Sequence, residues 1–273
     1  MSTVAAALVT YQSAGWLEQT LISIEAQTRR PSLIVVVDDG STDDTLDILA
    51  AHGVVAITSS SSAEDVTTRI AQNFQQAVMA CHDAELVVLG DHDDVWRPDR
   101  VERQATLLES SPQALMLASD GAVMDEDGTL TGATLRTVFP VLDEWATCTP
   151  AERMAYVLRH SIATGGASML RPGRFPSLDV PEGWLHDRWW SLVATTRDGM
   201  LIDAEAVIDY RVSDSQQVGL DTGAQGRGSI RRLRTLVGTG GSAMAKYRDL
   251  HRLLRPLAVD QEIATAIRLR NVL

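Results

Sequence analysis

The sequence predicts an α/β protein with a mainly parallel central sheet and a helical C-terminal tail. In the first half of the chain, short apolar runs typical of buried strands alternate with segments whose apolar residues recur at helical spacing. Strands that alternate with helices form parallel sheets, because right-handed crossovers place the helices on both faces. In the last part of the chain the pattern is helical and the charge turns basic.

Four buried strands are expected in the first half, with helices between them. The strands are expected at residues 4–9, 33–37, 54–57 and 86–89. Helices are expected at residues 15–27, after a cap at Ser41 or Thr42, at residues 65–80, and from Pro98 onward. Ligands of such sheets bind beyond the carboxyl ends of the strands, so the polar residues after each strand are expected to meet at one edge.

The second half of the chain is less regular. Strands are expected at residues 114–118 and 201–210, and helices at residues 151–159 and 188–196. Residues 231–273 are expected to be helical, with breaks around residues 238–241 and at Pro256. We therefore expect two units, a main domain at residues 1–219 and a basic helical extension at residues 220–273.

The charge distribution limits the partners of this chain. A net charge of −12 argues against binding to nucleic acid, because an acidic protein repels phosphate polymers. Residues 226–256 are the exception, since eight basic residues against one acidic residue give a net charge of +7 and leave −19 for the rest. Such a segment suits an anionic membrane surface. The alternatives are pairing with the acidic body and packing in a homo-oligomer.

Neither a signal peptide nor a membrane-spanning segment is expected. The N-terminus lacks a basic region, its apolar stretch is broken at residues 10–12, and no apolar run approaches the ~18 residues that span a bilayer. We therefore expect a cytoplasmic protein, with peripheral contact at the inner face of the cell membrane if the basic segment binds lipid. Cys81 and Cys148 are expected to be small buried hydrophobes.

The absence of several motifs excludes other enzyme classes. Lys246 is the only lysine, which excludes a Schiff base or a P-loop lysine elsewhere in the chain. The chain has no G-x-G-x-x-G after its first strand, no Walker A sequence and no G-x-S-x-G elbow. The six histidines show no zinc spacing.

The strongest local signal is the acidic sequence GDHDDVW at residues 90–96. The carboxylates of Asp91, Asp93 and Asp94 repel one another, and a cation is the usual way to keep them ionised at the end of a strand. Ligands that are all oxygen favour Mg²⁺ or Mn²⁺, which complete their coordination with substrate phosphates. The alternative is a solvated loop before a helix, in which Asp99 favours the helix N-terminus.

A second acidic sequence, VDDGSTDD at residues 37–44, follows the second expected strand. A carboxylate at Asp38 or Asp39 can accept a hydrogen bond from a pyrimidine base or a ribose hydroxyl. The alternative is an acidic helix cap, which accounts for residues 41–44 but leaves Asp38 and Asp39 unexplained.

Two later sequences also carry polar groups. WLHDRWW at residues 184–190 surrounds Asp187 with tryptophans. Desolvation raises the pKa of a carboxyl group and makes it a better base, and a Trp face such as that of Trp189 can stack on a sugar ring. The alternative is a core aromatic cluster with Asp187 as a helix cap. In YRVSDSQQVG at residues 210–219, Arg211 can bind a diphosphate, or it can form a surface salt bridge.

Taken in this order, these sequences resemble the inverting family 2 glycosyltransferases, which have the GT-A fold, a Rossmann-like fold of nucleotide-diphospho-sugar transferases. Within that family they are similar to bacterial rhamnosyltransferase-like and surface-polysaccharide enzymes. The resemblance covers about residues 4–219 and depends on four ordered blocks. These are LVTYQSAGWLEQTLISIEAQT, VVVDDGSTDDT, LGDHDDVWRPDRVE, and ATGGASML with HDRWW and YRVSDSQQVG.

The resemblance implies a nucleotide-binding set in the first half of the chain. Thr10, Tyr11 and Asp39 would hold the nucleoside, and Asp38 would support that loop. Arg69, in the helix expected at residues 65–80, belongs to the same set.

The resemblance also implies the reacting groups. Asp91 and Asp93 would form the Asp-x-Asp pair that holds Mg²⁺ or Mn²⁺ and the donor, with Asp93 the direct metal ligand. Gly165 and Gly166 would let backbone approach the donor sugar or the acceptor. Asp187 would be the general base.

The last block would close over the diphosphate, through Arg211 and the amides of Gln216 and Gln217. The chain departs from the family pattern at two positions. Gln12 stands where relatives often have Asn, and Ser213 stands where relatives often have a His that helps with the metal or the diphosphate. The second departure implies a looser metal shell.

The function implied is transfer of a sugar, with inversion, in the synthesis of cell-surface polysaccharide or glycoconjugate. The donor would be a dTDP- or UDP-linked sugar such as rhamnose, and the acceptor a hydroxyl of a glycan or of a lipid-linked molecule. One alternative is a sugar nucleotidyltransferase, which usually needs a glycine-rich, basic first loop where this chain has TYQSAGW. The other is a non-catalytic nucleotide-sugar-binding subunit.

Overall fold

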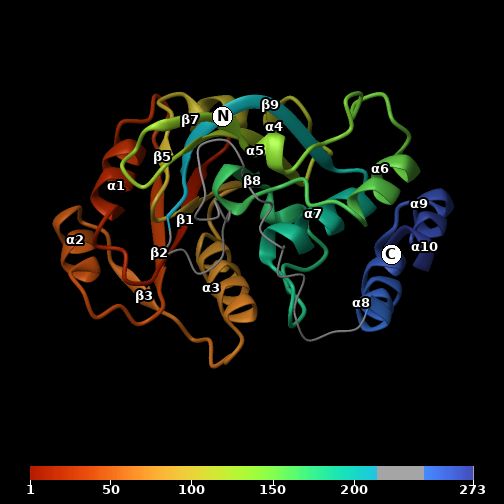
Figure 1. The fold of residues 1–273 in the computed structure, drawn as a ribbon, viewed down its shortest axis with the longest axis horizontal. Helices are drawn as coiled ribbons and strands as arrows, with labels where there is room; N and C mark the ends of the chain where they lie inside the picture. Colours follow the sequence, from red (N-terminus) through yellow and green to blue (C-terminus); the bar gives the residue numbers. More distant parts are fainter. Residues whose placement is uncertain (214–242, 273) are drawn as a thin grey trace.

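A mixed nine-stranded sheet is the centre of the structure, which is a computed structural model that describes residues 1–213 and 243–272 (Figure 1). The order of the strands is β3-β2-β1-β4-β8-β6-β9-β5, and β7 pairs with β6. Helices cover both faces of the sheet, as the alternation of strand and helix predicts.

The first half of the chain forms the parallel side of the sheet. Its strands are β1 (Val4–Thr10), β2 (Leu33–Asp38), β3 (Ala56–Thr58) and β4 (Leu86–Asp91). They pair in parallel, so their carboxyl ends meet at one edge, as expected. The helices between and after them are α1 (Leu17–Glu25), α2 (Thr45–Ala51), α3 (Val66–Ala80) and α4 (Arg100–Glu109).

One expected helix cap is wrong. The helix α2 begins at Thr45 with Asp44 at its N-cap, rather than after Ser41 or Thr42. Those two residues bind the neighbouring loop instead, because the Ser41 hydroxyl donates to Asp38 and Thr42 bonds to the side chain of Gln12.

The second half of the chain makes the sheet mixed. The strands are β5 (Val95–Trp96), β6 (Met116–Met124), β7 (Leu130–Thr134), β8 (Ser168–Leu170) and β9 (Met200–Arg211). The strand β8 lies antiparallel between β4 and β6. It brings the short 3-10 turn η1 (Gly165–Ala167) beside the end of β4. This turn carries the glycine pair that the sequence singles out.

The remaining helices of this half are α5 (Leu135–Val138), α6 (Pro150–Val157) and α7 (His186–Thr196). The helix α7 shares a core cluster with α3 and α6, whereas α1, α2 and α4 pack on the opposite cluster. Cys81 is buried as expected, but Cys148 is half-buried.

The C-terminal segment packs on the body rather than forming a separate tail. It contains α8 (Ala243–Asp249), a π-helical turn η3 (Leu250–Leu254), a 3-10 turn η4 (Arg255–Leu257), α9 (Gln261–Ala266) and α10 (Leu269–Val272). Four of its side chains are buried in the cluster that contains α7: Leu250, Leu254, Ile263 and Ile267. The backbone N–H of Val259 also donates to the carbonyl of Thr196, 3.0 Å away.

This packing limits the apolar surface that the basic segment could offer to a membrane. Leu250 and Leu254 face the core, so they do not give the helix an exposed apolar side for a membrane. Leu233, Leu236 and Val237 lie outside the described residues. Within residues 1–213 and 243–272, no helix has the length and apolar character needed to cross a membrane.

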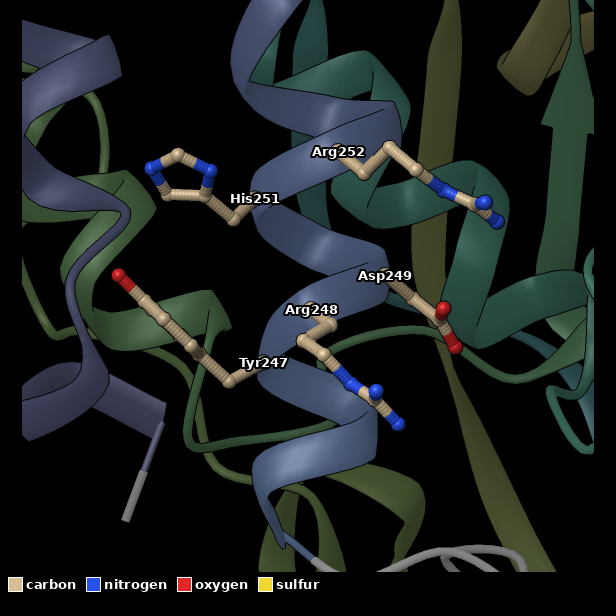
Figure 2. Close-up of a pocket in the computed structure, with 5 residues that line it drawn as sticks. All are labelled: Tyr247, Arg248, Asp249, His251 and Arg252. Atoms are coloured by element: carbon tan, nitrogen blue, oxygen red, sulfur yellow. The ribbon is translucent and has the colours of Figure 1, made fainter.

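A surface pocket lies on this C-terminal helical segment. Figure 2 shows its lining side chains, which project from successive turns: Tyr247, Arg248, Asp249, His251 and Arg252. Arg248 and Arg252 are exposed, so the described lining is a solvated, basic helix face. None of these residues is one of the carboxylates that the sequence predicts for the active site. Those carboxylates lie elsewhere, at the ends of the strands and in α7.

Candidate active site

Acidic side chains gather where the strand β4 ends. Asp91 is the last residue of β4, and the buried Asp93 and Asp94 follow it. The backbone of Gly166 lies against two of these carboxylates. A Cβ at that position would stand 2.4 Å from Oδ2 of Asp94 and 2.8 Å from Oδ2 of Asp91, which no side chain tolerates. Glycine is therefore required at residue 166 for the carboxylates to keep this position.

Burial and repulsion between the carboxylates make this acidic cluster harder to ionise. Burial, followed by the charges of Asp93 and Asp187, raises the pKa of Asp91 to about 7. Burial, followed by the charges of Asp93 and Asp91, raises the pKa of Asp94 well above its ordinary value, and within the described chain its Oδ2 has no hydrogen-bond partner. A divalent cation relieves such a cluster by neutralising it.

The donor set fits a hard cation. Carboxylate oxygens are the ligands of Mg²⁺ and Mn²⁺, and Mg²⁺ usually takes one or two carboxylates together with substrate phosphates. Among the described residues, no three acidic or histidine side chains converge on a single point that would suit an ion. The protein would thus supply two carboxylates from Asp91, Asp93 and Asp94, and leave the remaining positions to the diphosphate and water.

Asp187 lies in the first turn of α7 and faces the same turn η1. The backbone N–H of Gly165 donates to its Oδ2 over 3.2 Å, and the N–H of Arg188 donates to its Oδ1 over 2.6 Å. Burial raises its pKa to about 6 in spite of these bonds. A backbone hydrogen bond from Gly166 stabilises ionised Asp91 in the same way. Two consecutive residues therefore bind the two carboxylates, one each.

The aromatic cluster around Asp187 belongs to the core. Trp184 and Trp189 are 7% and 4% exposed, with ring centroids 5.4 Å apart. Trp189, expected in the acceptor region, thus offers no open face on which a sugar could stack in this structure. His186 is stacked on Phe74 at 3.9 Å, and burial lowers its pKa to about 3, so it is neutral. His186 also accounts for the glycine at residue 165, because a Cβ there would lie 2.6 Å from Nε2 of His186.

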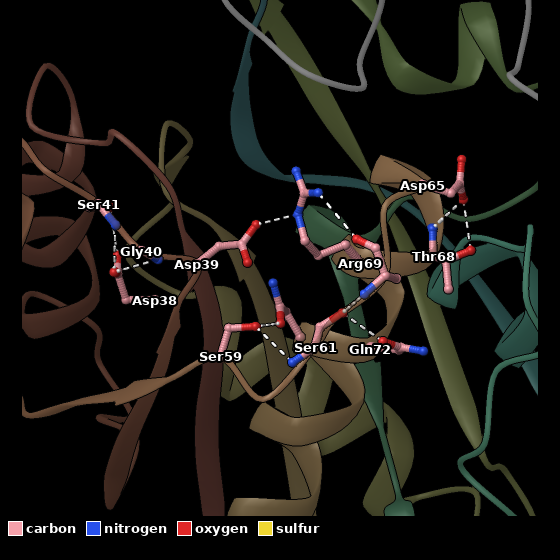
Figure 3. Close-up of polar contacts among 12 residues, drawn as sticks. Asp38, Asp39, Gly40, Ser41, Ser59, Ser61, Asp65, Thr68, Arg69 and Gln72 are labelled. Atoms are coloured by element: carbon pink, nitrogen blue, oxygen red, sulfur yellow. Dashed lines mark hydrogen bonds and ion pairs between the residues drawn. The ribbon is translucent and has the colours of Figure 1, made fainter.

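The expected nucleotide-binding residues divide into a supporting pair and an accessible group. Figure 3 shows Asp38, Asp39 and Arg69 from these two groups. Thr10 is buried, and its hydroxyl donates to Oδ1 of Asp38 over 2.8 Å. Asp38 also accepts from the backbone N–H groups of Gly40 and Ser41. These residues hold the loop after β2 in place, which is the role expected of Asp38, and the Thr10 hydroxyl is engaged in the same task.

The accessible group consists of Tyr11, Asp39 and Arg69. Nε of Arg69 donates to Oδ2 of Asp39 over 2.8 Å (Figure 3). Tyr11 is 41% exposed. Both members of the ion pair remain partly exposed. A carboxylate and an exposed aromatic ring at the carboxyl ends of β1 and β2 can bind a nucleoside.

The departure at Gln12 has a structural explanation. This residue adopts a left-handed conformation with φ of 50°, a region that Asn tolerates better than most residues. Its amide compensates by binding the next loop, since its Oε1 accepts from the backbone N–H of Thr42 over 2.7 Å. Gln12 therefore joins the loop after β1 to the loop after β2.

Arg211 organises the acidic loop from within. It is 2% exposed, and its Nε donates to the carbonyl of Asp93 over 3.0 Å. Its other nitrogens donate to the carbonyl of Glu126 and to Oε1 of Gln19. Its backbone N–H donates to Oδ1 of Asp94. These donors are directed at protein acceptors, and the expected contact with a diphosphate stays a prediction. Gln216 and Gln217 lie outside the described residues.

Three residues of this site were not singled out by the sequence. The sequence shows Asp94 as part of an acidic run and Tyr210 as a strand residue at the start of YRVSDSQQVG, without a role for either. Burial and the four carboxylates raise the pKa of Tyr210 well above its ordinary value, so its phenol stays protonated. Arg100 is fully buried on α4 close to Asp91 and Asp94, whose charges act on it. A charged residue at an otherwise apolar helix position is the one sequence signal that could have identified Arg100.

The family of the chain is established by sequence comparison. The model of a family described as Glycosyl transferase family 2 matches residues 6–171. An uncharacterised glycosyltransferase from a Nostoc species is 32% identical over 107 residues, which cover 37% of this chain and 31% of that relative. The match therefore spans about a third of the relative's own length.

Solved structures share the fold. The crystal structure of TarS 1-349 from S. aureus in complex with UDP-GlcNAc has a TM-score of 0.61 and 15% identity, covering 95% of this chain and 68% of that one. Glucosyl-3-phosphoglycerate synthase from Mycobacterium tuberculosis, in complex with Mn²⁺, UDP and glucosyl-3-phosphoglycerate, has a TM-score of 0.52 and 15% identity, covering 78% and 73%. At these identities the likeness establishes the fold alone, a GT-A type α/β fold.

The geometry of the glycine pair predicts the effect of one methyl group. Gly166→Ala would push the added carbon into Asp91 and Asp94, and displacing packed groups costs about 1–3 kcal/mol of unfolding free energy. We expect a lower Tm and weaker Mn²⁺ binding, measured by titration with electron paramagnetic resonance. Gly173→Ala is the matched control, because a Cβ there has no neighbour within 4 Å. Unchanged Mn²⁺ binding in Gly166→Ala would contradict this account of the cluster.

Proposed function

The chain belongs to glycosyltransferase family 2, and we propose that it is an inverting, metal-dependent enzyme that transfers a sugar from a nucleoside diphosphate to a hydroxyl acceptor. One observation carries the proposal. The carboxylates of Asp91 and Asp187 come from distant parts of the chain and are bound by the consecutive residues Gly166 and Gly165. Leaving-group stabilisation and proton removal would then take place on either side of one short turn.

The roles of the two carboxylates follow from their surroundings. Asp187 would accept the proton of the acceptor hydroxyl as its oxygen attacks the anomeric carbon, because a pKa near 6 is suited to a base at neutral pH. Asp91, Asp93 and Asp94 would hold Mg²⁺ or Mn²⁺, which, when bound, stabilises the charge that develops on the leaving diphosphate. A single base without a placed nucleophile supports one displacement and inversion at the anomeric carbon.

The donor is proposed to be a UDP- or dTDP-linked sugar, with rhamnose among the candidates. Tyr11, Asp39 and Arg69 form the accessible group that would bind the nucleoside, and two structures of similar fold are described with UDP-GlcNAc and with UDP. The acceptor is proposed to be a hydroxyl of a glycan or of a lipid-linked molecule in the rhamnosyltransferase-like, surface-polysaccharide branch. A screen of nucleotide sugars that measures release of the nucleoside diphosphate tests the donor and the activity together.

The base assignment predicts a specific kinetic defect. Asp187→Asn removes the proton acceptor but keeps the shape of the side chain, so turnover should fall by about 10²–10⁴, while the Kd of the donor stays nearly unchanged. The base works only when ionised, so activity of the wild-type enzyme should fall as the pH drops through about 6, and the variant should lose this limb. Asp83→Asn is the control, since Asp83 is almost fully exposed and remote from the site. Turnover retained in Asp187→Asn would reassign the base.

The metal assignment predicts a defect that depends on the cation. Asp93→Ala should weaken nucleoside-diphosphate binding in Mn²⁺ by at least about 10–100-fold, the loss typical of residues that only support a metal ligand. In chelator the wild-type protein and the variant should bind equally weakly. Calorimetric titration in both buffers provides the comparison. Equal affinity of the two proteins in Mn²⁺ would remove Asp93 from the metal site.

We also propose that the basic C-terminal helices bring the enzyme to an anionic membrane, where a lipid-linked acceptor is found. The exposed Arg248 and Arg252 support this location, because each cation near an anionic leaflet contributes about 1 kcal/mol. The protein should sediment with anionic vesicles at low salt and release as salt rises.

The control for this experiment follows from the packing of the segment. Deleting it would uncover the core contacts of Leu250 and Ile263, so charge reversal is the cleaner test. Arg248→Glu with Arg252→Glu should abolish sedimentation, and Arg30→Glu with Arg174→Glu should not. If the wild-type protein stays in the supernatant at every salt concentration, the segment serves only the fold or an oligomer.

A further inference from the structure

A buried arginine lies beneath the acidic cluster and takes no part in the mechanism described above. Arg100 is the first residue of α4 and has no exposed surface. Its guanidinium lies 3.9 Å from the centre of the Trp96 ring. Nη2 donates to the carbonyl of Leu89 over 2.6 Å, two residues before Asp91. Within the described parts of the chain, Nη1 has no hydrogen-bond partner.

A chain of buried hydrogen bonds connects this arginine to the turn that contains the glycine pair. Nε of Arg100 donates to Oε1 of Gln104, one helical turn later, over 3.3 Å. Nε2 of Gln104 in turn donates to the carbonyl of Ala167 over 2.9 Å. Ala167 ends the turn η1, whose first two residues bind Asp187 and Asp91. Arg100 is therefore hydrogen-bonded directly to β4, the strand that ends at Asp91, and through Gln104 to the turn η1.

Packing alone does not account for a charge at this position. A guanidinium loses its hydration when it is buried, and an apolar side chain of similar size usually serves a dry interior as well or better. The positive charge of Arg100 is opposed by Asp91 and Asp94, which act on it electrostatically although no direct ion pair forms in the described structure. The observations therefore favour an electrostatic role.

We infer that Arg100 is the resident counter-ion of the acidic cluster, a positioning residue that keeps Asp91 and Asp94 together without metal and repels the divalent cation when it binds. The inference rests on the proposed metal-dependent function. The guanidinium of Arg100 and a bound cation compete, because both neutralise the same carboxylates. A site with such a counter-ion binds its cation more weakly and releases it more readily than the carboxylates alone would.

The test compares charge with shape at residue 100. Arg100→Lys keeps the charge and loses the fork of donors, whereas Arg100→Gln and Arg100→Met lose the charge. Mn²⁺ affinity is measured by electron paramagnetic resonance on the protein without nucleotide, and the rise in Tm on adding Mn²⁺ is measured for the same samples. Arg103→Met is the control, since Arg103 lies on the same helix but pairs with Asp203.

We expect the two neutral variants to have a lower Tm without metal, to bind Mn²⁺ about tenfold more tightly, and to gain more in Tm from Mn²⁺ than the wild-type protein. Arg100→Lys should resemble the wild type in both measurements. The Tm gain remains readable in a variant that is only marginally folded, because Mn²⁺ replaces the missing charge.

Two failures can be told apart. If the wild-type protein responds to Mn²⁺ but the neutral variants gain no more than it does, or if Arg100→Lys groups with them, Arg100 serves packing and only this inference is overturned. If the wild-type protein shows no response to Mn²⁺ with or without UDP, the proposed metal site fails and the inference is overturned with it.

Discussion

Like charges that are held together away from water are the constraint on which this structure depends. Asp91 and Asp94 are buried at the end of β4, where burial and neighbouring carboxylates raise the pKa of both. Three groups compensate for these charges. They are the guanidinium of Arg100, a backbone hydrogen bond from Gly166 to Asp91, and the backbone N–H of Arg211, which donates to Asp94. Each of these groups comes from a different element, α4, η1 or β9, so the surroundings of the acidic cluster depend on contacts that are distant in sequence.

The mixed part of the sheet brings the glycine turn η1 to these carboxylates. The crossover from β4 through α4 leads to β6 and leaves the place beside β4 to the antiparallel strand β8, which delivers η1 to the end of β4. The first two residues of this turn leave no room for a side chain, because His186 lies where a Cβ of Gly165 would stand, and Asp91 and Asp94 lie where a Cβ of Gly166 would stand. Backbone approach replaces side-chain contact, and the two carboxylates come to share one turn.

The sequence predicts the parallel half and the longer elements of the mixed half, such as β6, β9 and α7, but it misses the short strands, for physical reasons. Period and buried apolar runs identify β1, β2 and β4, and the topology of parallel strands then places Asp38 and Asp91 at one edge. The strand β8 has three residues and β5 has two, which is too short for any period to register. Nor does sequence spacing reveal that Arg100 meets the acidic cluster or that Trp189 is buried, since both follow from tertiary packing.

The same packing relates the C-terminal segment to the chemistry. Asp187 is held at one end of α7, and the other end of this helix accepts a hydrogen bond from Val259, just before α9. Leu250, Leu254 and Ile263 fill the cluster against which α7 rests. The proposed base is therefore positioned from both ends of its helix, by the glycine turn on one side and by residues some 60 to 80 positions later on the other. The proposed donor half of the site is built locally by the parallel strands, whereas the proposed acceptor half depends on contacts that are distant in sequence. The segment that carries the basic surface therefore also helps to hold the proposed base.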